Sequence, residues 1–494
     1  MSAILQRGSL FAVVKEITPG TLVAPSSGAQ AIPLRPGFAM EYSVAELQND
    51  EVVNDKGATK SIGGTESVNG THPAYLKGSE LAGVAPEVGL LIESSLGTVV
   101  EAATEYVTAA SSTTKVIKVG SGVGANFQVG QALMVKDTTV SIRNIESISG
   151  DDLTLNFALP SAPAAGVSLG KAVLYKPAST SPTYSSWLYN GNGGAIQAAA
   201  GCQTSNINMT FTAGEQALIE FTYEGSKYYF NPIILPAVKY LDFTDDSGTY
   251  AAAVAAGIYA SPLEMQRALQ AAIDATATTE DLLVSYSNTT GMFTISTATS
   301  SVLSLLFVTG TNTANDIGSY IGFTADQTGA TTYTGTAQSL VFPFTADYDD
   351  ASNIVVKEAE LLIGDVDDII CKCARTVNVV ISTPVVNVEC ICAVGGIQEK
   401  VSITREVTMT AELILNPYDV SVFDKLKNNT SIKAMLNVGP KSGGNWVAAK
   451  AGNVYLGNAS VTGNTIGGDD FAFVNVTVKG YVTSTLKDVY VNYV

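Results

Sequence analysis

Four of the five cysteines lie between residues 371 and 392, in two Cys-x-Cys pairs. Side chains at positions i and i+2 of a strand share one face, so Cys371 would point with Cys373, and Cys390 with Cys392. A hairpin that paired Cys371 with Cys392 and Cys373 with Cys390 would gather four thiols. Pro384 fits a turn better than a ladder position, however, and a turn there shifts the register and spoils that match.

These four thiols could bind a metal ion, form disulfides or remain free. Structural zinc sites usually use C-x(2–4)-C knuckles whose turn wraps the metal, and an extended Cys-x-Cys lacks that turn. A C-x-x-C motif or a neighbouring histidine that would make a reactive thiolate is also missing. We therefore favour buried free thiols over disulfides within or between subunits, and we favour a metal site least. The fifth cysteine, Cys202, is expected to be a small core residue.

The sequence offers little else for catalysis. The single histidine, His72, lies beside Pro73 and near Gly70, and is predicted to be a loop residue rather than a catalytic base. The segment 120–127, GSGVGANF, lacks the following helix of a dinucleotide site and is predicted to be a turn. Acidic clusters at 244–250, 347–352 and 364–370 match no calcium-loop pattern and are predicted to be solvated turns. We expect no catalytic residue, no metal and no cofactor, and therefore not an enzyme.

The overall charge excludes one large class of function. The formal net charge is −18 and the isoelectric point is near 4.5. Proteins that grip nucleic acid need clustered Lys and Arg to neutralise phosphates, which this composition does not supply. No apolar run approaches the roughly 20 residues of a membrane helix, and the first residues lack the apolar core of a signal peptide. We expect a soluble protein that folds in a reducing cytoplasm.

The elements that would position these residues are mostly strands. Only 15% of the residues are charged and 45 are glycine, which is typical of β-rich proteins with many tight turns. Three helices are expected, at 85–97, 261–275 and 417–428. Ser261 and Glu264 form a capping box at the start of the second helix, and Leu263, Leu269, Ala272 and Ile273 form its apolar stripe. Residues 41–80 are predicted to form a long exposed hairpin or loop.

The order of the segments resembles that of the tail tube proteins of long-tailed bacteriophages. The matching segments are VVKEITPGTLVAPSSGAQAIPL (13–34), KGSELAGVAPEVGLLIESSLG (77–97), AAAGCQTSNINMTFTAGEQALIEFTYEG (198–225), and the C-terminal strands from VKEAELLIG (356–364) onward. They cover more than half of the chain, and their linear order is more specific than any one motif.

The resemblance implies a mainly β fold, a β-sandwich tail-tube core with a flanking helix. The core would comprise 1–104, 176–234 and 346–494, interrupted by two small inserted domains. The first, 105–175, reads as a β-barrel-like unit of short strands, and the second, 235–345, as an α+β unit. Inserts of this size would face outward, because they would block the channel. External domains favour a bare, non-contractile tail, although a contractile one stays open.

The resemblance also implies a structural role in the virion tail, with assembly in the cytoplasm of the host bacterium. Subunits would join edge to edge into hexameric rings that stack into a tube, through which DNA is ejected. Expected partners are other copies of the chain, tail initiator or baseplate proteins, a terminator protein, and a sheath in a contractile tail. The tape-measure protein and phage DNA would occupy the lumen without specific binding. An acidic, Lys- and Arg-poor wall would let DNA pass without adhering.

Within this resemblance, the acidic loop at 48–72 would reach the adjacent ring. Asp50, Glu51, Asp55 and Lys56 are the candidate ring-to-ring contacts, with a solvated hairpin as the alternative. Two other functions stay open. One is another tail or capsid component, such as a sheath, terminator or decoration protein. The other is a glycan-binding adhesin, in which surface tyrosines, Trp187 or Trp446 would stack on sugar rings.

Overall fold

The computed structural model describes most of the chain, and the strands it contains pair almost entirely antiparallel. The described residues are 6–47, 61–79, 81–102, 104–276, 278, 280–300, 302–349, 352–365, 368–370, 374–390, 392, 397–414, 421–467 and 472–494. The fold is mainly β with several antiparallel sheets, as the composition predicts. Within the described part of the chain, every helix is too short or too polar to cross a bilayer.

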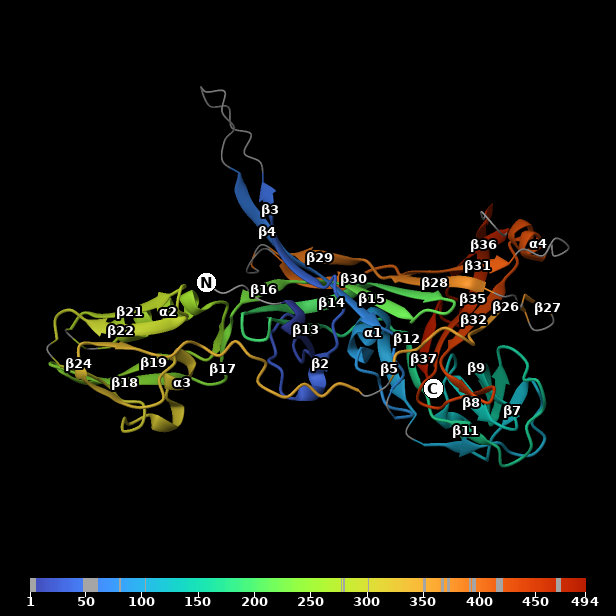
Figure 1. The fold of residues 1–494 in the computed structure, drawn as a ribbon, viewed down its shortest axis with the longest axis horizontal. Helices are drawn as coiled ribbons and strands as arrows, with labels where there is room; N and C mark the ends of the chain where they lie inside the picture. The colour runs from blue at the N-terminus through green and yellow to red at the C-terminus, as the bar shows by residue number, and fades with distance from the viewer. Residues whose placement is uncertain are drawn as a thin grey trace, which may run out of the picture.

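The largest sheet has an upper branch that brings together three distant parts of the chain (Figure 1). Its strands follow one another in the order β3 (Ala39–Leu47), β4 (Ile62–Tyr75), β15 (Leu218–Gly225), β14 (Ala195–Thr212), β28 (Ala374–Ser382), β31 (Glu406–Ile414), β36 (Phe473–Gly480) and β35 (Gly452–Gly467). The predicted long hairpin is therefore β3–β4. The junction between β14 and β28 joins the two halves of the chain.

The long strands β14 and β35 each continue into a lower branch of the same sheet. The first half of β14 pairs with β13 (Tyr184–Asn190) and β16 (Lys227–Phe230), and β13 leads on to β1 (Leu10–Lys15) and β2 (Ala31–Ile32). The first half of β35 pairs with β32 (Ile432–Val438) and β37 (Tyr490–Tyr493). From β32 the branch continues to β26 (Glu360–Asp365) and β27 (Asp368–Ile370), and from β37 to β12 (Val173–Pro177) and β5 (Gly97–Glu101).

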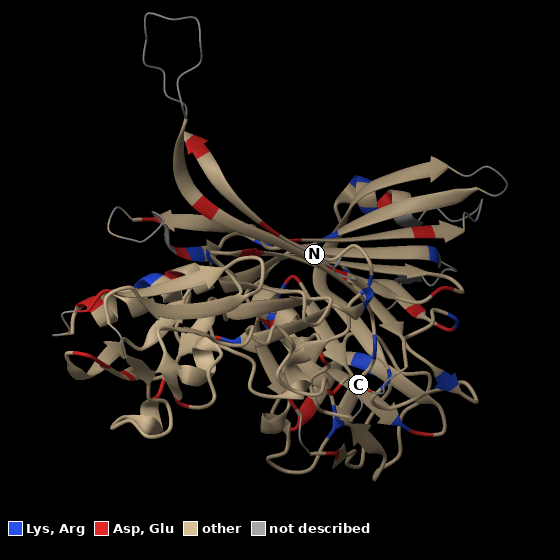
Figure 2. Ribbon diagram, turned by 60° about the vertical axis from the view of Figure 1, so that its left-hand side comes forward, with Lys and Arg blue, Asp and Glu red and all other residues tan. Residues whose placement is uncertain are grey.

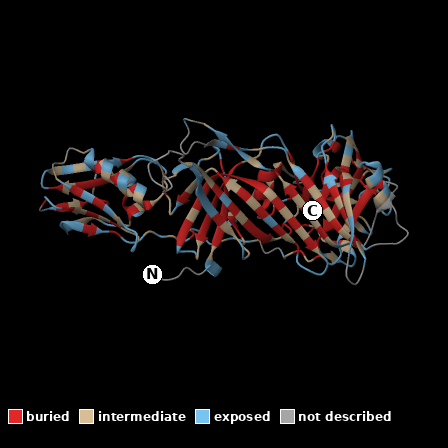
Figure 3. Ribbon diagram, turned by 90° about the horizontal axis from the view of Figure 1, so that it is seen from above, coloured by how far each residue is buried: buried red, intermediate tan, exposed pale blue. Residues whose placement is uncertain are grey.

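One large hydrophobic cluster fills the space between the branches. Alternate residues of the upper strands, such as Met209, Val379 and Met409, are almost fully buried beside lower-branch residues such as Leu436 and Val491. Burying a side chain of this size contributes on the order of 1.5–3 kcal/mol, so the branches hold each other in place. The burial view from above shows this alternation along the strands (Figure 3).

Helix α1 (Gly89–Leu96) confirms the first predicted helix. Leu91, Ile92 and Leu96 are fully buried in the large cluster, as their spacing predicts. Gly97 ends the helix with φ = 108°, a left-handed conformation that favours glycine. Helix α4 (Ser421–Asn428) packs Phe423 and Leu426 against the same cluster; the start of the predicted 417–428 helix lies outside the described residues.

Residues 106–170 form a six-stranded sheet with a hydrophobic cluster of its own. The order is β6 (Tyr106–Val107), β11 (Ser168–Gly170), β8 (Ala132–Lys136), β9 (Val140–Ser149), β10 (Asp152–Leu155) and β7 (Val116–Lys118). A bridge between Thr108 and Val119 links the two outer strands. Ile117, Leu133, Ile145 and Leu153 lie in its core.

Residues 233–334 pack around a separate cluster at one end of the molecule (Figure 1). The strands are β17 (Ile233–Leu235), β18 (Lys239–Asp245), β19 (Gly248–Val254), β20 (Gly257–Tyr259), β21 (Leu282–Ser287), β22 (Met292–Thr297), β23 (Leu303–Leu305), β24 (Gln327–Ala330) and β25 (Thr332–Thr334), with a short helix α3 (Gly318–Ile321). Helix α2 (Pro262–Asp274) confirms the second predicted helix.

The Ser261 cap of α2 is confirmed, but the reciprocal bond of the predicted capping box goes to Ala260 rather than to Ser261. The Ser261 hydroxyl accepts a hydrogen bond from the Glu264 N–H at 3.4 Å, and the Glu264 carboxylate accepts one from the Ala260 N–H at 2.5 Å. The buried face differs in part from the predicted stripe. Met265, Leu269 and Ile273 are fully buried, whereas Leu263 and Ala272 are only partly buried.

Four short strands complete the fold. They are β29 (Val385–Glu389), β30 (Ile397–Ser402), β33 (Lys441–Ser442) and β34 (Asn445–Trp446). Strand β29 extends the line of β28, and β30 precedes β31, so β28–β29 and β30–β31 make one long hairpin.

Candidate functional site

The cysteine segment forms two successive strands that pair with other parts of the sheet, not with each other. The break near Pro384 is confirmed, but β28 pairs with β14 and β31, and β29 pairs with β30. From Ala374 to Glu389 the chain therefore runs in one direction for roughly 50 Å, at ~3.3 Å per residue. The four-thiol hairpin, which Pro384 already disfavoured, does not form, and the two strands do not pair with each other in any register.

Two of the four clustered thiols lie within the described residues, and neither is buried. Cys390 is a half-buried free thiol and Cys392 is an exposed one, so buried thiols are the wrong description for this pair. Cys371 and Cys373 lie outside the described residues. Cys202 is fully buried, as predicted, and burial raises the pKa of its thiol to about 12.

The histidine is not in a loop, contrary to the prediction. His72 lies within β4 opposite Phe221, is fully buried, and stacks on Phe11 with 4.7 Å between ring centroids. Both ring nitrogens lack a hydrogen-bond partner, and burial lowers the pKa to about 3. The flanking Pro73 is tolerated because β3 pairs with β4 only as far as Thr71, so no ladder bond needs an N–H at residue 73, and its carbonyl accepts from the Arg35 N–H at 3.1 Å. A neutral histidine without a polar partner is a core residue.

Two other candidate segments, 120–127 and 244–250, form turns that are held by carboxylates. In segment 120–127 the Asp151 carboxylate accepts hydrogen bonds from the Gly124 and Gly122 N–H groups, at 3.0 and 3.1 Å, and these bonds lower its pKa. A carboxylate therefore occupies the place that a phosphate would take. In segment 244–250, Asp245 accepts from the Ser247 N–H at 2.8 Å and closes the turn. Among the described residues, no group of three or more His, Cys, Asp or Glu side chains could hold a metal ion.

The most distinctive surface is the open face of the upper branch. No other layer lies above β15, β14, β28 and β31 in Figures 1 and 2, between the β3–β4 hairpin and the β35–β36 hairpin. Because the intervening side chains are buried in the large cluster, the others point to this open side. They are mostly Thr and Asn: Asn206, Asn208, Thr210, Thr212, Thr222, Thr376, Asn378, Thr408, Thr410, Asn475 and Thr477.

Charges are sparse on this face. The five strands β15, β14, β28, β31 and β36 contribute four glutamates and one lysine at these positions: Glu220, Glu224, Glu406, Glu412 and Lys479. Arg375, at the irregular end of β28, lies 3.8 Å from Glu412, and Lys479 binds Glu406 at 2.6 Å. The charge view shows strands that are largely free of Lys, Arg, Asp and Glu (Figure 2). Such a face is hydrated but offers no cluster of cations to a phosphate.

Two strand edges bound this face, and both are unpaired. Strand β3 pairs only with β4, and Ser460–Gly467 of β35 pairs only with β36, among the residues that the structure describes. The β35 segment carries no charged residue, and Ile466 on it is 56% exposed. Natural proteins usually cover or charge such an edge, because it pairs readily with another chain.

The β3–β4 hairpin projects well beyond the rest of the sheet (Figure 1). Leu47 and Ile62 lie opposite each other near its end and are exposed, together with Tyr42 and Val44. The predicted contact residues Asp50, Glu51, Asp55 and Lys56 lie beyond this pair, outside the described residues. The exposed apolar pair was not anticipated, although Leu47 follows alternating residues that could have indicated it.

Comparison with protein-family profiles and with characterised proteins finds no match.

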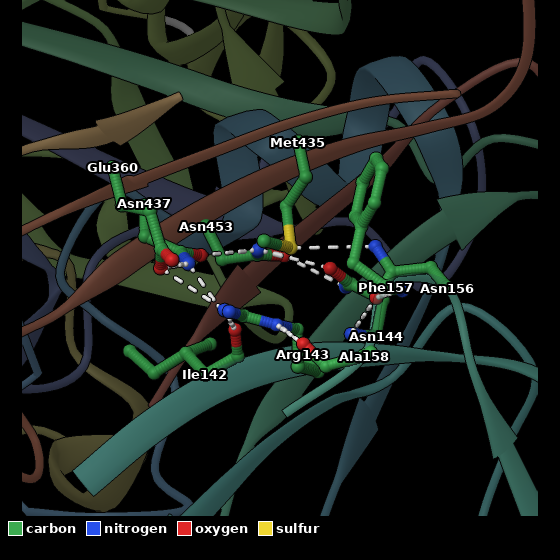
Figure 4. Close-up of polar contacts among 10 residues, drawn as sticks. All are labelled: Ile142, Arg143, Asn144, Asn156, Phe157, Ala158, Glu360, Met435, Asn437 and Asn453. Carbon is green, nitrogen blue, oxygen red and sulfur yellow. Dashed lines mark hydrogen bonds and ion pairs between the residues drawn. The ribbon is translucent and has the colours of Figure 1, made fainter. Parts of the chain in front are cut away.

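A buried polar network fixes the 106–170 unit to the rest of the chain (Figure 4). The amides of Asn144 and Asn453 exchange hydrogen bonds of 2.8 and 3.0 Å, and Asn453 also donates to Asn437 at 2.7 Å. Arg143, which is 5% exposed, binds the Glu360 carboxylate at 3.1 Å. Amide side chains do not gain or lose a proton near neutral pH, so they cannot act as a general acid or base. The network therefore serves to dock the 106–170 unit.

The two tryptophans proposed as stacking platforms for an adhesin are not on the surface, whereas tyrosines such as Tyr42 and Tyr481 are exposed. Trp187 and Trp446 are 4% and 5% exposed, and the Trp187 indole donates a hydrogen bond to the Val23 carbonyl at 2.8 Å. Neither indole can stack on a sugar ring without rearrangement. One groove is lined by residues such as Arg7, Arg35 and Tyr348, and the residues described along it include no carboxylate.

Proposed function

We propose that the protein is a structural subunit of a bacteriophage tail tube, which self-assembles into stacked rings around a channel for DNA. One observation carries the proposal: a broad sheet presents an open, polar face with few cations between two unpaired edges. In a closed ring the edges would be used up by neighbouring subunits. The face would then line the channel.

The chemistry of the face suits a conduit. Thr and Asn side chains keep the wall hydrated. The four glutamates outnumber the two cations, Lys479 and Arg375, and each cation lies beside a glutamate, so duplex DNA finds no cation cluster to bind. The net charge of −18 acts in the same direction, because it repels phosphate. DNA and the tape-measure protein would therefore pass without specific binding.

The remaining features have places in this proposal. The two branches of the large sheet would be the layers of the β-sandwich core, with α1 and α4 at its side. The units at 106–170 and 233–334 lie away from the open face and would be inserted domains on the outer surface of the tube (Figure 1). The apolar end of β3–β4 would contact the adjacent ring, together with the loop that contains Asp50, Glu51, Asp55 and Lys56.

Electron microscopy of the purified protein tests this function. Negative stain at high protein concentration, with and without a tail-initiation complex, should show stacked rings with a channel wide enough for duplex DNA. Monomers that persist even with the initiator would contradict the proposal.

A further inference from the structure

We propose that the chain contains two copies of one ring-forming unit, and that a second copy of the chain binds its free β35 edge through β3. The register would be the one that already exists between β14 and β28. This inference rests on the proposed function and specifies its partner surface. The first unit has the upper strands β3, β4, β15 and β14, and the second has β28, β31, β36 and β35.

The two units have the same strand order. The sheet order is β3-β4-β15-β14 in the first unit and β28-β31-β36-β35 in the second. Each unit is thus a long hairpin (β3–β4 or β28–β31) beside a second hairpin (β14–β15 or β35–β36), whose later strand lies next to the long one. The registers also agree. The pair Met40↔Gly70 corresponds to Val379↔Met409, and Phe221↔His72 corresponds to Val476↔Ala411.

Irregular positions repeat as well, which a chance likeness of two sheets would not produce. The ladder between β14 and β15 shifts between Thr204 and Asn206, and the ladder between β35 and β36 shifts at the corresponding place, between Val461 and Gly463. A β-bulge is a specific local feature, so its repetition supports a duplicated unit.

The lower branches match in the same way. The order β2-β1-β13-β14-β16 in the first unit corresponds to β27-β26-β32-β35-β37 in the second. A second irregularity is shared, between Tyr184 and Ser186 in β13 and between Ile432 and Ala434 in β32. Helix α1 contacts β14, and α4 contacts the corresponding β35.

The projecting hairpins are equivalent too. Leu47 faces Ile62 near the end of β3–β4, and Val386 faces Val401 at the matching place in β29–β30. All four side chains are exposed, between 40% and 63%. Each chain therefore presents two similar apolar hairpin ends.

The β14–β28 junction within the chain predicts the geometry of the junction between two chains. Strand β14 corresponds to β35, and β28 corresponds to β3, so the β14–β28 ladder predicts a ladder between β35 of one chain and β3 of the next. Asn208↔Val380 becomes Thr465↔Glu41, and Met209↔Val379 becomes Ile466↔Met40. Both β35 and β3 lack a strand on that side among the described residues. The pairing would cover Ile466, which is 56% exposed in the single chain.

The duplication also sets the number of chains. Each chain contributes two units, and one of every two junctions lies within a chain. A ring with the six units implied by the resemblance would therefore contain three chains. Its cross-section should show three-fold chain symmetry, and six-fold chain symmetry would overturn this count.

Disulfide trapping tests the register. In a background with Cys390→Ser and Cys392→Ser, we would make Glu41→Cys with Thr465→Cys, and oxidise the tubes mildly. Directly opposed positions on neighbouring strands lie ~5 Å apart at Cβ, against ~7–8 Å for positions offset by two residues. The pair 41/465 should give interchain ladders on a non-reducing gel, at several-fold higher yield than the offset pair Ser43→Cys with Thr465→Cys.

The equivalent internal pair provides a matched control. Asn208→Cys with Val380→Cys should form a disulfide within one chain, without any interchain ladder. Tubes that crosslink through 43/465, or through neither pair, while 208/380 crosslinks, would overturn the proposed register but leave the tube function standing. Folded protein that crosslinks internally and never forms rings or tubes would instead overturn the tube function and the pairing between copies with it.

Discussion

Ile466 occupies the position in β35 that Met209 occupies in β14, yet Met209 is 1% exposed and Ile466 is 56% exposed. The difference arises because Met209 has β28 on its second side, opposite Val379, whereas Ile466 has only β36 beside it among the residues that the structure describes. This contrast identifies the edge whose burial assembly should require.

Replacement of Ile466 by lysine should therefore prevent tube formation while the chain stays folded. A lysine at the pairing edge would place a charge in a desolvated junction, which costs several kcal/mol if unpaired. Sedimentation and electron microscopy would measure the loss of assembly. Leu283→Lys, at a 60% exposed position in the 233–334 unit, is the matched control and should assemble normally. Equal effects of both changes would contradict the assignment of the edge.

Removal of the 233–334 unit should leave assembly intact. Its hydrophobic cluster is separate from the large one. A deletion of 236–339 with a flexible linker removes only the partly buried Ile258 and Ala260 from the neighbouring cluster around Trp187 and Tyr189. This deletion keeps Phe342, which packs against Tyr189 with 5.2 Å between ring centroids. Microscopy should show thinner tubes. A deletion variant with native-like circular dichroism that fails to assemble would argue that the unit contributes to the interface.

The buried amide network should be sensitive to the loss of one member. Asn453→Ala removes hydrogen bonds to Asn144, Asn437 and Asn492 and leaves the buried amide oxygens of Asn144 and Asn437 without a donor, at a cost of about 2–3 kcal/mol. Chemical denaturation would measure the change in the free energy of unfolding. Asn126→Ala, in an exposed turn, should change it by less than ~0.5 kcal/mol. A small effect at Asn453 would mean that water replaces the lost amide.

Stability should fall in mild acid because of His72. Its folded pKa is about 3 while an unfolded histidine titrates near 6.5, so the unfolded state binds the proton first as the pH falls. Between pH 7 and 4.5 the native chain should lose ~2.5 kcal/mol more unfolding free energy than a His72→Leu variant. Denaturation of both proteins at the two pH values measures this difference. The same pH dependence in both would show that His72 is protonated in the folded state.

The thiols should separate into reactive and inert groups. Cys390 and Cys392 are accessible, whereas Cys202 is fully buried and its pKa is raised to about 12, so alkylation at pH 8 should label the former and spare Cys202. Peptide mass spectrometry would locate the labels. Replacement of all five cysteines by serine or alanine should leave assembly unchanged. Interchain disulfides on a non-reducing gel of native particles would contradict that expectation.

Local patterns predicted elements well and long-range pairing poorly. Helical spacing identified α1 and α2, and clustered Asn, Asp and Gly identified the long β3–β4 hairpin. The Cys-x-Cys hairpin failed because β28 pairs across the molecule with β14, and no local signal encodes that partner. His72 was misplaced because its flanking Gly and Pro suggested a loop, whereas Gly70 sits beneath the ring of Tyr223 in a buried strand.

The duplicated unit could not be read from the sequence for a similar reason. Corresponding positions such as Thr71 and Thr410, or Gly225 and Gly480, are identical, but most others share only a burial class. The halves also differ where the 106–170 unit docks. There Asn437 and Asn453 of the network replace Tyr189 and Ile196 of the first half. The two halves share their pattern of strand pairing, and many different side chains are compatible with the same backbone geometry.

The β14–β28 junction has a kinetic consequence. Because its two strands are covalently linked, they meet at an effective concentration that a linker typically sets in the millimolar range, without the translational and rotational entropy cost of a bimolecular encounter. In a ring of duplicated subunits, half of the joints would therefore form during folding, with their alignment already fixed. Only the other half would depend on subunit concentration and on a nucleus, and only there could a strand slip out of alignment as the tube grows.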